Sequence, residues 1–433
     1  MELVVGIMRT DELKRVLISQ REEMEEFIGR ERIIPREVEE NVRGVLSSPR
    51  VLTILGVRRS GKSVLAWRLS GENSLYINFF DERLSEFGPG DFERLLNAAR
   101  ELWGEPKVVV LDEVQEVEGW QKFVSRLMVN RGVIVTGSSS KLLSGELATY
   151  LTGRHVDITL FPFSFREFLR LQGFEFKENW EYSDRVVSEI KRLLEEYLEI
   201  GGFPEAIRFG RLYLPLIYRD LVERDIILRH GVKHQSALRE LARYLVSNYS
   251  NEFTYSRLGS IVGIRDVHTI RDYVEYMEQA YLIFQLRRFS FKPRSQLISP
   301  RKVYPIDTGL ARSVSLKSHP ERGRLMELAV FLEIKRRLSY SLIQGDVFYW
   351  RDDKGEVDFI VRSEGGLSPV QVAFSLEESR EREVSNIVRV SKILGSRDAL
   401  IVTWEEEETI EKEGVKIEVM PLWKFLTGGS RIF

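Results

Sequence analysis

The chain carries the stretch Gly56-Val57-Arg58-Arg59-Ser60-Gly61-Lys62-Ser63. This stretch matches the phosphate-binding pattern GxxxxGK[ST], with an apolar run before it and a helix-like segment after it. The glycines let backbone N–H groups surround a β-phosphate, and the helix adds the positive end of its dipole. We expect Lys62 to neutralise phosphate charge and the Ser63 hydroxyl to bind Mg²⁺. The predicted ATP-binding residues are Gly56, Val57, Arg58, Arg59, Ser60, Gly61, Lys62, Ser63 and Val64.

A second apolar run, Val108–Leu111, ends in the acids Asp112 and Glu113. We expect Asp112 to hold Mg²⁺ through water and Glu113 to polarise the water that attacks the γ-phosphate. A surface pair of acids at a strand end is the alternative explanation. The chain has no NKxD-type motif that reads guanine, which favours ATP as the nucleotide and Mg²⁺ as the metal.

The next apolar run leads into Thr136-Gly137-Ser138, where a hydroxyl could contact the γ-phosphate. Thr136 and Ser138 are therefore the predicted γ-phosphate sensors. Arg154 could supply the positive charge that stabilises the transition state, in its own subunit or in a neighbouring one. On spacing alone, a surface ion pair explains Arg154 nearly as well.

Apolar runs typical of buried parallel strands alternate with helix-like segments from 51 to about 137, which predicts a doubly wound α/β core. Before this core, residues 10–48 read as two helices, the second starting near Pro35. The chain then reads as mostly helical, with a helix–turn–helix pattern at 255–277 and a strand at 281–286. From about 323 onward the pattern is helix, strand, strand, helix, strand, strand. We predict four segments: 1–50 helical, 51–182 the P-loop core, 183–310 helical and winged-helix, and 311–433 a second α/β domain.

Composition narrows the class of protein. Of 433 residues, 43% are hydrophobic and 30% charged, as in soluble globular chains, and the net charge of −2 provides no global basic field. With no cysteine there is no disulfide, thiolate nucleophile or zinc–thiolate cluster. No apolar run approaches the roughly 18 residues of a membrane span, and the first residues do not resemble a signal peptide. We therefore expect a cytoplasmic protein without a membrane partner.

Further motifs follow in a consistent order along the chain. They are Asp112-Glu113-Val114-Gln115 with Trp120, Thr136–Ser139, 151–154, Phe161-Pro162-Phe163-Ser164-Phe165-Arg166-Glu167-Phe168, Gly201-Gly202-Phe203-Pro204-Glu205, Tyr218-Arg219-Asp220 and Lys302-Val303-Tyr304-Pro305-Ile306-Asp307-Thr308-Gly309-Leu310. Together with the P-loop, they make the sequence resemble a family of prokaryotic AAA-type ATPases, abundant in archaea, whose C-terminal half is a conserved domain of unknown function. The resemblance implies an AAA-like core, a winged-helix segment and a C-terminal domain similar to restriction endonucleases.

The endonuclease-like resemblance points to Asp358 as the first acid of a metal-binding nuclease site. The next strand-like run, 369–373, carries Gln371 where an acid is usual and Ala373 where a lysine is expected. An amide weakens metal binding and alanine cannot activate water. Glu327 could contribute a carboxylate. We therefore expect Glu327, Asp358 and Gln371 to be the relic of a nuclease site, without cleavage activity.

The helix–turn–helix pattern suggests double-stranded DNA as a partner. The candidate contacts are Arg265, His268 and Arg271 at the second helix and Arg287 and Arg288 just after it. The alternative is a helix–turn–helix used only for packing. The leading hypothesis is an ATPase switch coupled to DNA or to a protein partner, with an oligomer as one arrangement. The rival hypothesis is a DNA-binding protein in which ATP is only a conformational ligand; an ATP-gated nuclease is a third.

Overall fold

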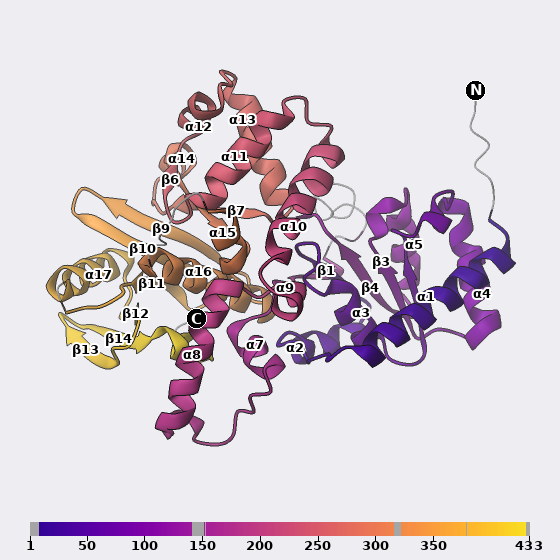
Figure 1. Ribbon diagram of the computed structural model, residues 1–433, viewed down its shortest axis with the longest axis horizontal. Coiled ribbons are helices and arrows are strands. Elements are labelled where there is room, and N and C mark those ends of the chain that lie inside the picture. Colours follow the sequence, from indigo (N-terminus) through magenta and orange to yellow (C-terminus); the bar gives the residue numbers. More distant parts are fainter. Residues whose placement is uncertain (1–7, 141–150, 152, 316–321, 378, 430–433) are drawn as a thin grey trace. The chain divides into compact units, whose positions relative to one another are not determined.

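The computed structural model describes residues 8–140, 151, 153–315, 322–377 and 379–429. These residues form two compact units (Figure 1). The first unit is Met1–Leu160 with Ser339–Leu342, and the second is Phe161–Leu338 with Ile343–Phe433.

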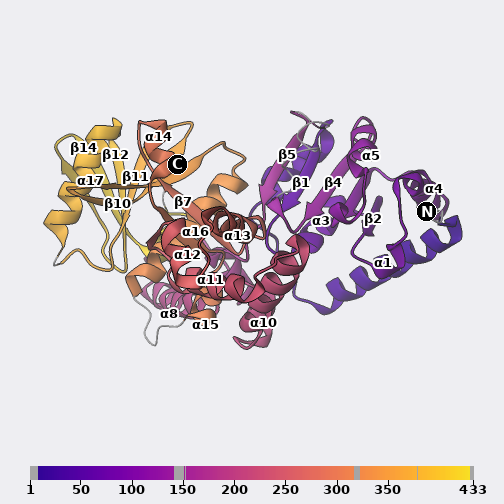
Figure 2. The same cartoon turned by 90° about the horizontal axis from the view of Figure 1, so that it is seen from above.

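The first unit contains a five-stranded sheet in which every described strand pairing is parallel. The strand order is β2-β3-β4-β1-β5, and Figure 2 shows β5, β1, β4 and β2 in that order across the sheet. The strands are β1 (Val51–Leu55), β2 (Ser74–Asn78), β3 (Val108–Asp112), β4 (Gly132–Gly137) and β5 (His155–Thr159). The side chains of β1 are all buried, which is why its sequence is continuously apolar rather than alternating. The predicted parallel α/β core is confirmed.

Helices pack against this sheet through apolar faces. They are α1 (Thr10–Arg30), α2 (Glu39–Arg43), α3 (Lys62–Ser70), α4 (Phe92–Trp103) and α5 (Trp120–Leu127). Helix α1 buries Leu13, Val16 and Leu17 in the same core as Leu95 of α4. Of the two helices predicted in 10–48, the first is confirmed. The second begins at Glu39 rather than near Pro35, and it continues as a 3₁₀ turn over Gly44–Ser47.

The second unit opens with helices and ends in a mixed sheet. The helices are α7 (Phe165–Leu171), α8 (Asp184–Ile200), α9 (Pro204–Phe209), α10 (Tyr213–Asp220), a π-helical segment (Leu221–Leu228), α11 (Gln235–Ser247), α12 (Tyr255–Val262), α13 (Val267–Gln279), α14 (Pro293–Ile298), α15 (Thr308–Val314), α16 (Arg322–Tyr340), α17 (Arg380–Leu394) and α18 (Leu422–Leu426). The predicted helix–turn–helix over 255–277 is present as α12 and α13. No helix in the described ranges is long and apolar enough to cross a membrane.

One nine-stranded sheet runs through the second unit in the order β13-β14-β12-β11-β10-β9-β7-β8-β6. Its strands are β6 (Glu252–Phe253), β7 (Ile283–Arg288), β8 (Arg301–Pro305), β9 (Asp346–Asp352), β10 (Gly355–Ser363), β11 (Gly366–Val372), β12 (Asp398–Thr403), β13 (Glu408–Lys412) and β14 (Val415–Pro421). Strand β7 pairs antiparallel with β8 and parallel with β9, so the sheet joins strands from both sides of residue 310. The division into four segments stays a prediction.

The C-terminal pattern predicted from the sequence is incomplete. After α16 the chain forms three strands, α17, three more strands and α18, instead of two strands, a helix and two strands. The strand missed before α17 is β9, which a tight turn at Asp353 and Lys354 joins to β10. Figure 2 shows α17 beside β14, β12, β11 and β10.

A close backbone contact explains two of the glycine motifs. A Cβ at Gly202 would lie 2.2 Å from the carbonyl oxygen of Phe163, and one at Gly309 would lie 2.2 Å from that of Ile200. The backbone N–H of Gly202 donates to Asp307 Oδ2 (2.7 Å), and that of Leu310 donates to Asp307 Oδ1 (2.8 Å). The buried Asp307 carboxyl therefore joins the loop before α9 to the start of α15.

Candidate nucleotide-binding site

The P-loop lies at the carboxyl end of β1, where the local sequence dictates the turn. Gly56 has φ of +144°, and a Cβ there would lie 2.3 Å from the carbonyl oxygen of Leu160. Gly61 is left-handed, with φ of +95°, and immediately precedes α3. Only glycine meets both requirements without strain. The loop therefore has the backbone geometry that a phosphate cradle needs, with the start of α3 directed into it.

Lys62 lies inside this loop. Its Nζ donates to the carbonyl oxygens of Gly56 and Val57, each at 3.1 Å, and lies 3.9 Å from Glu113 Oε1. The side chain is 4% exposed, so its charge faces the loop rather than solvent. The predicted lysine and the predicted catalytic acid thus come together at one edge of the sheet.

Asp112, at the end of β3, is held by three hydroxyl groups. Tyr76 donates to Asp112 Oδ2 at 2.7 Å, Thr136 donates to Oδ1, and Ser63 also hydrogen-bonds with this carboxyl group. Burial raises the pKa of Asp112, and the charge of Glu113 raises it further, whereas the three hydroxyls lower it. The two predicted Mg²⁺ ligands, Ser63 and Asp112, are therefore in contact, with an oxygen-only donor set that suits Mg²⁺.

Glu113 has a left-handed backbone, with φ of +50° and ψ of +45°. Non-glycine residues adopt this conformation rarely and at a cost of about 1–3 kcal/mol. Its N–H donates to Thr136 Oγ1 at 3.0 Å, and the side-chain amide of Gln115 donates to Glu113 Oε2 at 2.5 Å. Thr136, predicted as a γ-phosphate sensor, thus contacts both acids, while Ser138 is buried nearby at the end of β4.

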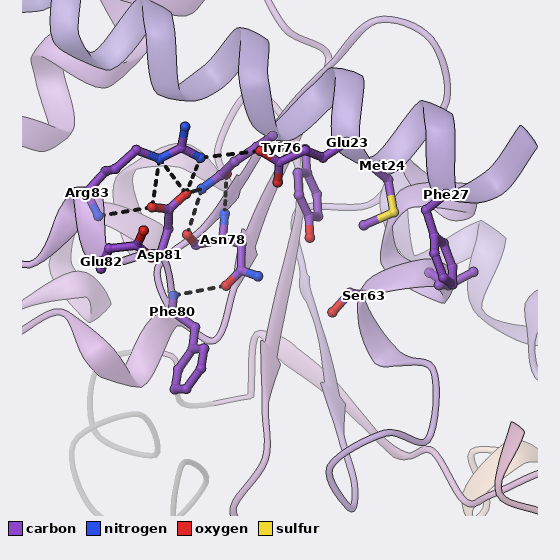
Figure 3. Close-up of a pocket in the computed structure, with 12 residues that line it drawn as sticks. Glu23, Met24, Phe27, Ser63, Tyr76, Asn78, Phe80, Asp81, Glu82 and Arg83 are labelled. Atoms are coloured by element: carbon purple, nitrogen blue, oxygen red, sulfur yellow. Dashed lines mark hydrogen bonds and ion pairs between the residues drawn. The ribbon is translucent and has the colours of Figure 1, made fainter. Parts of the chain in front are cut away.

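A pocket of about 720 Å³ opens beside Ser63. Figure 3 shows Ser63 and Tyr76 on one side of it, with Asp81 and Arg83 paired on the other. Gln20 of α1 also lines the pocket, and it donates to Asn78 O at 3.0 Å and to Asp81 Oδ2 at 2.8 Å. The hydrogen bond from Arg83 lowers the pKa of Asp81 to about 2.

The other predicted loop residues surround this centre. Arg58 places its guanidinium 5.1 Å from the ring centroid of Phe80, and Arg59 is left-handed, with φ of +68°. Val57 and Ser60 are fully buried, and Val64 is half-buried in the first turn of α3. Arg36, which the sequence did not single out, donates to the carbonyl oxygen of Ser60 at 2.8 Å.

Arg154 lies at the opposite end of the strands from the P-loop. Val51 of β1 is level with His155 of β5, so Arg154 precedes the amino ends of the strands, whereas Gly56 follows their carboxyl ends. The five residues of β1, or six residue steps, separate these levels, which is roughly 20 Å at about 3.3 Å per residue. The side chain of Arg154 is exposed and cannot span that distance. The structure therefore does not bring Arg154 to the P-loop of its own chain.

Of the five candidate DNA-binding residues, Arg265 lies in the turn before α13, His268 and Arg271 lie on α13, and Arg287 and Arg288 lie on β7. Arg265, His268, Arg271 and Arg287 are exposed, and Arg288 is half-buried. Asp266 caps α13 by accepting from the N–H groups of His268 and Thr269, each at 3.1 Å. Thus the start of α13 and one end of β7 carry exposed basic side chains.

The three candidate relic residues do come together in the second unit. Gln371 Oε1 accepts from the N–H of Asp358 at 3.2 Å, and Asp358 Oδ2 accepts from the N–H of Val372 at 3.0 Å. Glu327 reaches the same cluster through Lys302, whose Nζ lies 3.0 Å from Glu327 and 3.5 Å from Asp358. Burial, and then the charge of Glu327, raise the pKa of Asp358, whereas the ammonium of Lys302 lowers it.

The sequence interpretation missed two side chains of these sites, Tyr76 and Lys302. Each is a buried polar side chain within a strand, and each contacts a carboxylate. A polar group buried in a strand requires a partner. That signal is present in the sequence, but it does not say which partner the fold supplies.

Family models match three consecutive parts of the chain. A model described as an AAA domain matches residues 48–169. Models described as "Domain of unknown function (DUF8612)" and "Domain of unknown function (DUF4143)" match residues 191–321 and 322–425. The AAA match contains every residue of the candidate site from Gly56 to Arg154.

Two full-length relatives are similar to the chain. An uncharacterized protein of Methanocaldococcus jannaschii is 32% identical over 424 residues, with 92% of each chain covered. An uncharacterized protein of Haemophilus influenzae is 31% identical over 394 residues, covering 86% of this chain and 94% of that one. Among solved structures, the replication initiator DnaA bound to AMPPCP and single-stranded DNA aligns at 17% identity over 56% of this chain and 86% of that one. Its TM-score is 0.25, too low to support an argument.

Proposed function

The chain belongs to the same family as these two relatives, and from that premise we propose that its AAA domain binds and slowly hydrolyses ATP, as a switch coupled to DNA or to a protein partner. One observation carries the proposal: Lys62, Ser63, Asp112 and Glu113 converge at the carboxyl edge of one parallel sheet. P-loop ATPases place their phosphate-binding and metal-binding groups at this edge.

Each residue of the site has a separate role in ATP binding or hydrolysis. The backbone of Gly56–Ser63 holds the phosphates, and Lys62 compensates their negative charge. Ser63 and Asp112 would hold Mg²⁺, which when bound offsets charge on the β- and γ-phosphates. Glu113 orients a water molecule toward the γ-phosphorus and accepts a hydrogen bond from it.

The contacts around the two acids support a positioning role for Thr136. Its hydroxyl donates to Asp112 and accepts from the N–H of Glu113, so it fixes both acids relative to β4. Gln115 restrains the Glu113 carboxylate in the same way. Ser138 remains the proposed γ-phosphate sensor. Arg154 can stabilise charge at the γ-phosphate only if a second copy of the chain supplies it.

Steady-state ATP hydrolysis with two variants tests the assignment. Lys62→Ala should lose ATP binding or turnover, because it removes the charge inside the loop. Glu113→Gln should keep ATP affinity and lose hydrolysis, because the amide no longer accepts the water's proton. Glu116→Gln is the matched control, since Glu116 is exposed in the adjoining turn and should leave turnover unchanged. Retained turnover in Glu113→Gln would remove Glu113 from the mechanism.

A specific observation favours DNA as the partner coupled to this switch. Helices α11, α12 and α13 are followed by the β7–β8 hairpin, and β6 pairs with β8. This order of helices and paired strands supports the proposed winged helix, in which the second helix of the helix–turn–helix, here α13, would enter the major groove. The exposed Arg271 and Arg287 lie on α13 and at the end of β7, where a DNA backbone would pass.

A further inference from the structure

The buried ammonium group of Lys302 is surrounded by carboxylates from two other elements of the second unit. Its Nζ lies 2.5 Å from Glu356 Oε1, 3.0 Å from Glu327 Oε1 and 3.5 Å from Asp358 Oδ1. Lys302 comes from β8, Glu327 from α16, and Glu356 and Asp358 from β10. The lysine side chain is 4% exposed.

The number of N–H donors on the Lys302 ammonium equals the number of carboxylates around it. An ammonium carries three N–H donors, and three carboxylates each present an oxygen to it. No donor of Lys302 is then left over for water or for a phosphate. A buried carboxylate cluster without a positive charge would be strongly disfavoured by mutual repulsion, so a cation at this point is required.

The surrounding residues hold the carboxylates toward the lysine. Tyr304, two residues along β8, donates to Glu327 Oε1 at 2.6 Å. The N–H of Val372 donates to Asp358 Oδ2, the oxygen that does not face Lys302. The side-chain oxygen of Gln371 accepts a hydrogen bond from the backbone N–H of Asp358, so it is not directed at the position of a bound ion.

We propose that the Lys302 ammonium permanently occupies the position that a divalent cation would take among Glu327, Glu356 and Asp358. In the described part of the chain no group of three or more carboxylates is arranged to hold a metal ion, and here the lysine lies between the three that come together. Asp358 and Glu356 also line an open pocket of about 560 Å³, so solvent ions have a route to the cluster. The lysine, rather than a lack of access, excludes the metal. This inference is independent of the proposed ATPase activity.

Removal of the ammonium should convert the cluster into a metal site. Lys302→Met keeps much of the apolar stem and leaves three carboxylates to bind a cation. The probe is Mn²⁺, followed by the paramagnetic resonance of the free ion, with the full chain carrying Ser63→Ala and Asp112→Asn so that the nucleotide site contributes no metal binding. With Lys302 present we expect no saturable Mn²⁺ site. Lys302→Met should bind one Mn²⁺ per chain at least about tenfold more tightly, since carboxylate number sets affinity. Adding Glu327→Gln should weaken this new site.

Lys335→Met is the matched control. Lys335 lies on α16, and burial lowers its pKa, but its ammonium faces the ring of Phe284 instead of the carboxylate cluster. This variant loses the ammonium of a half-buried lysine from the same unit and should gain no Mn²⁺ site.

Two results would overturn the proposal. One is a Mn²⁺ site in the chain that retains Lys302 and that Glu327→Gln removes; this measurement does not depend on the folding of a lysine variant. The other is a folded Lys302→Met chain without Mn²⁺ binding. Lys302→Met could unfold in the absence of metal, and recovery of its thermal transition by Mn²⁺ would then support the proposal. The proposal is contradicted when neither Lys302→Met nor the less charged Lys302→Met/Asp358→Asn binds Mn²⁺.

Discussion

Lys62 and Arg154 lie at opposite ends of the strands in the five-stranded sheet. Lys62 follows the carboxyl end of β1, and Arg154 precedes the amino end of its parallel neighbour β5. The N–H of Val51 donates to the carbonyl oxygen of Arg154 at 2.9 Å, and this hydrogen bond holds Arg154 at the amino end of β1. A P-loop and an arginine at opposite ends of the strands of one sheet can act on a single nucleotide only when two copies of the chain associate.

We therefore expect Arg154→Ala to keep ATP affinity and to lose about tenfold or more of turnover at concentrations where chains associate. An equal mixture of Arg154→Ala and Lys62→Ala chains should hydrolyse ATP faster than either alone, because the Lys62→Ala chain still supplies Arg154. Turnover should be measured against protein concentration, with Arg170→Ala, on α7 of the second unit, as the control. Full activity of Arg154→Ala at every protein concentration would show that Arg154 takes no part in ATP hydrolysis.

The phenol of Tyr76 gives a second prediction, about the metal. Tyr76→Phe removes the hydrogen bond that lowers the pKa of Asp112, so the buried carboxyl holds its proton more tightly and binds Mg²⁺ less well. We expect the Mg²⁺ concentration for half-maximal turnover to rise by roughly three- to tenfold, about 1 kcal/mol, with unchanged affinity for ATP in the absence of metal.

The control for Tyr76→Phe is Tyr218→Phe, because the buried Tyr218 hydroxyl has no hydrogen-bond partner among the residues that the structure describes. A merely structural role of Tyr76 would lower the thermal midpoint without shifting the Mg²⁺ dependence. An unshifted Mg²⁺ titration would therefore contradict the positioning role.

Asp307 should make the stability of the second unit depend on pH. Burial raises the pKa of Asp307 from 3.8 to about 6, although the N–H groups of Gly202 and Leu310 lower it in part. The folded state therefore binds a proton more tightly than the unfolded state, and this contribution to stability is present in full below about pH 4 and lost as pH rises through 6. The thermal midpoint of the wild-type chain minus that of Asp307→Asn should fall over this range and level off near pH 7.

Asp266→Asn supplies a control of opposite sign. Hydrogen bonds from Thr269 and from two backbone N–H groups lower the pKa of Asp266. Its contribution is present above pH 4 and lost as the pH falls below, so the corresponding difference in thermal midpoint should rise with pH. Parallel pH profiles for the two variants would rule out the assigned role of the buried Asp307.

The sequence identified the parts of the fold that depend on local patterns. The apolar runs predicted the parallel core, and the P-loop motif located its nucleotide-binding edge, because glycine at positions 56 and 61 has a purely local cause. Contacts between distant residues were not predictable in this way. Lys302 is 25 residues from Glu327 and 56 from Asp358, and only the pairing of β8 within the larger sheet brings them together. Likewise, the position of Arg154 follows from the register of β5 against β1, which spacing along the chain does not reveal.

Salt dependence can separate the DNA binding proposed for α13 and strand β7 from general charge effects. Each arginine that neutralises a DNA phosphate contributes about 1 to the slope of log affinity against log salt concentration. Arg271→Ala/Arg287→Ala should therefore reduce that slope by about 2 and weaken binding at low salt. Arg185→Ala/Arg192→Ala removes two arginines from α8 and serves as the matched control, with an unchanged slope. If the wild-type chain binds no double-stranded DNA even at low salt, the proposed role of α13 in DNA binding is wrong. If both double variants lose the same slope, the attraction is diffuse and does not reside in α13.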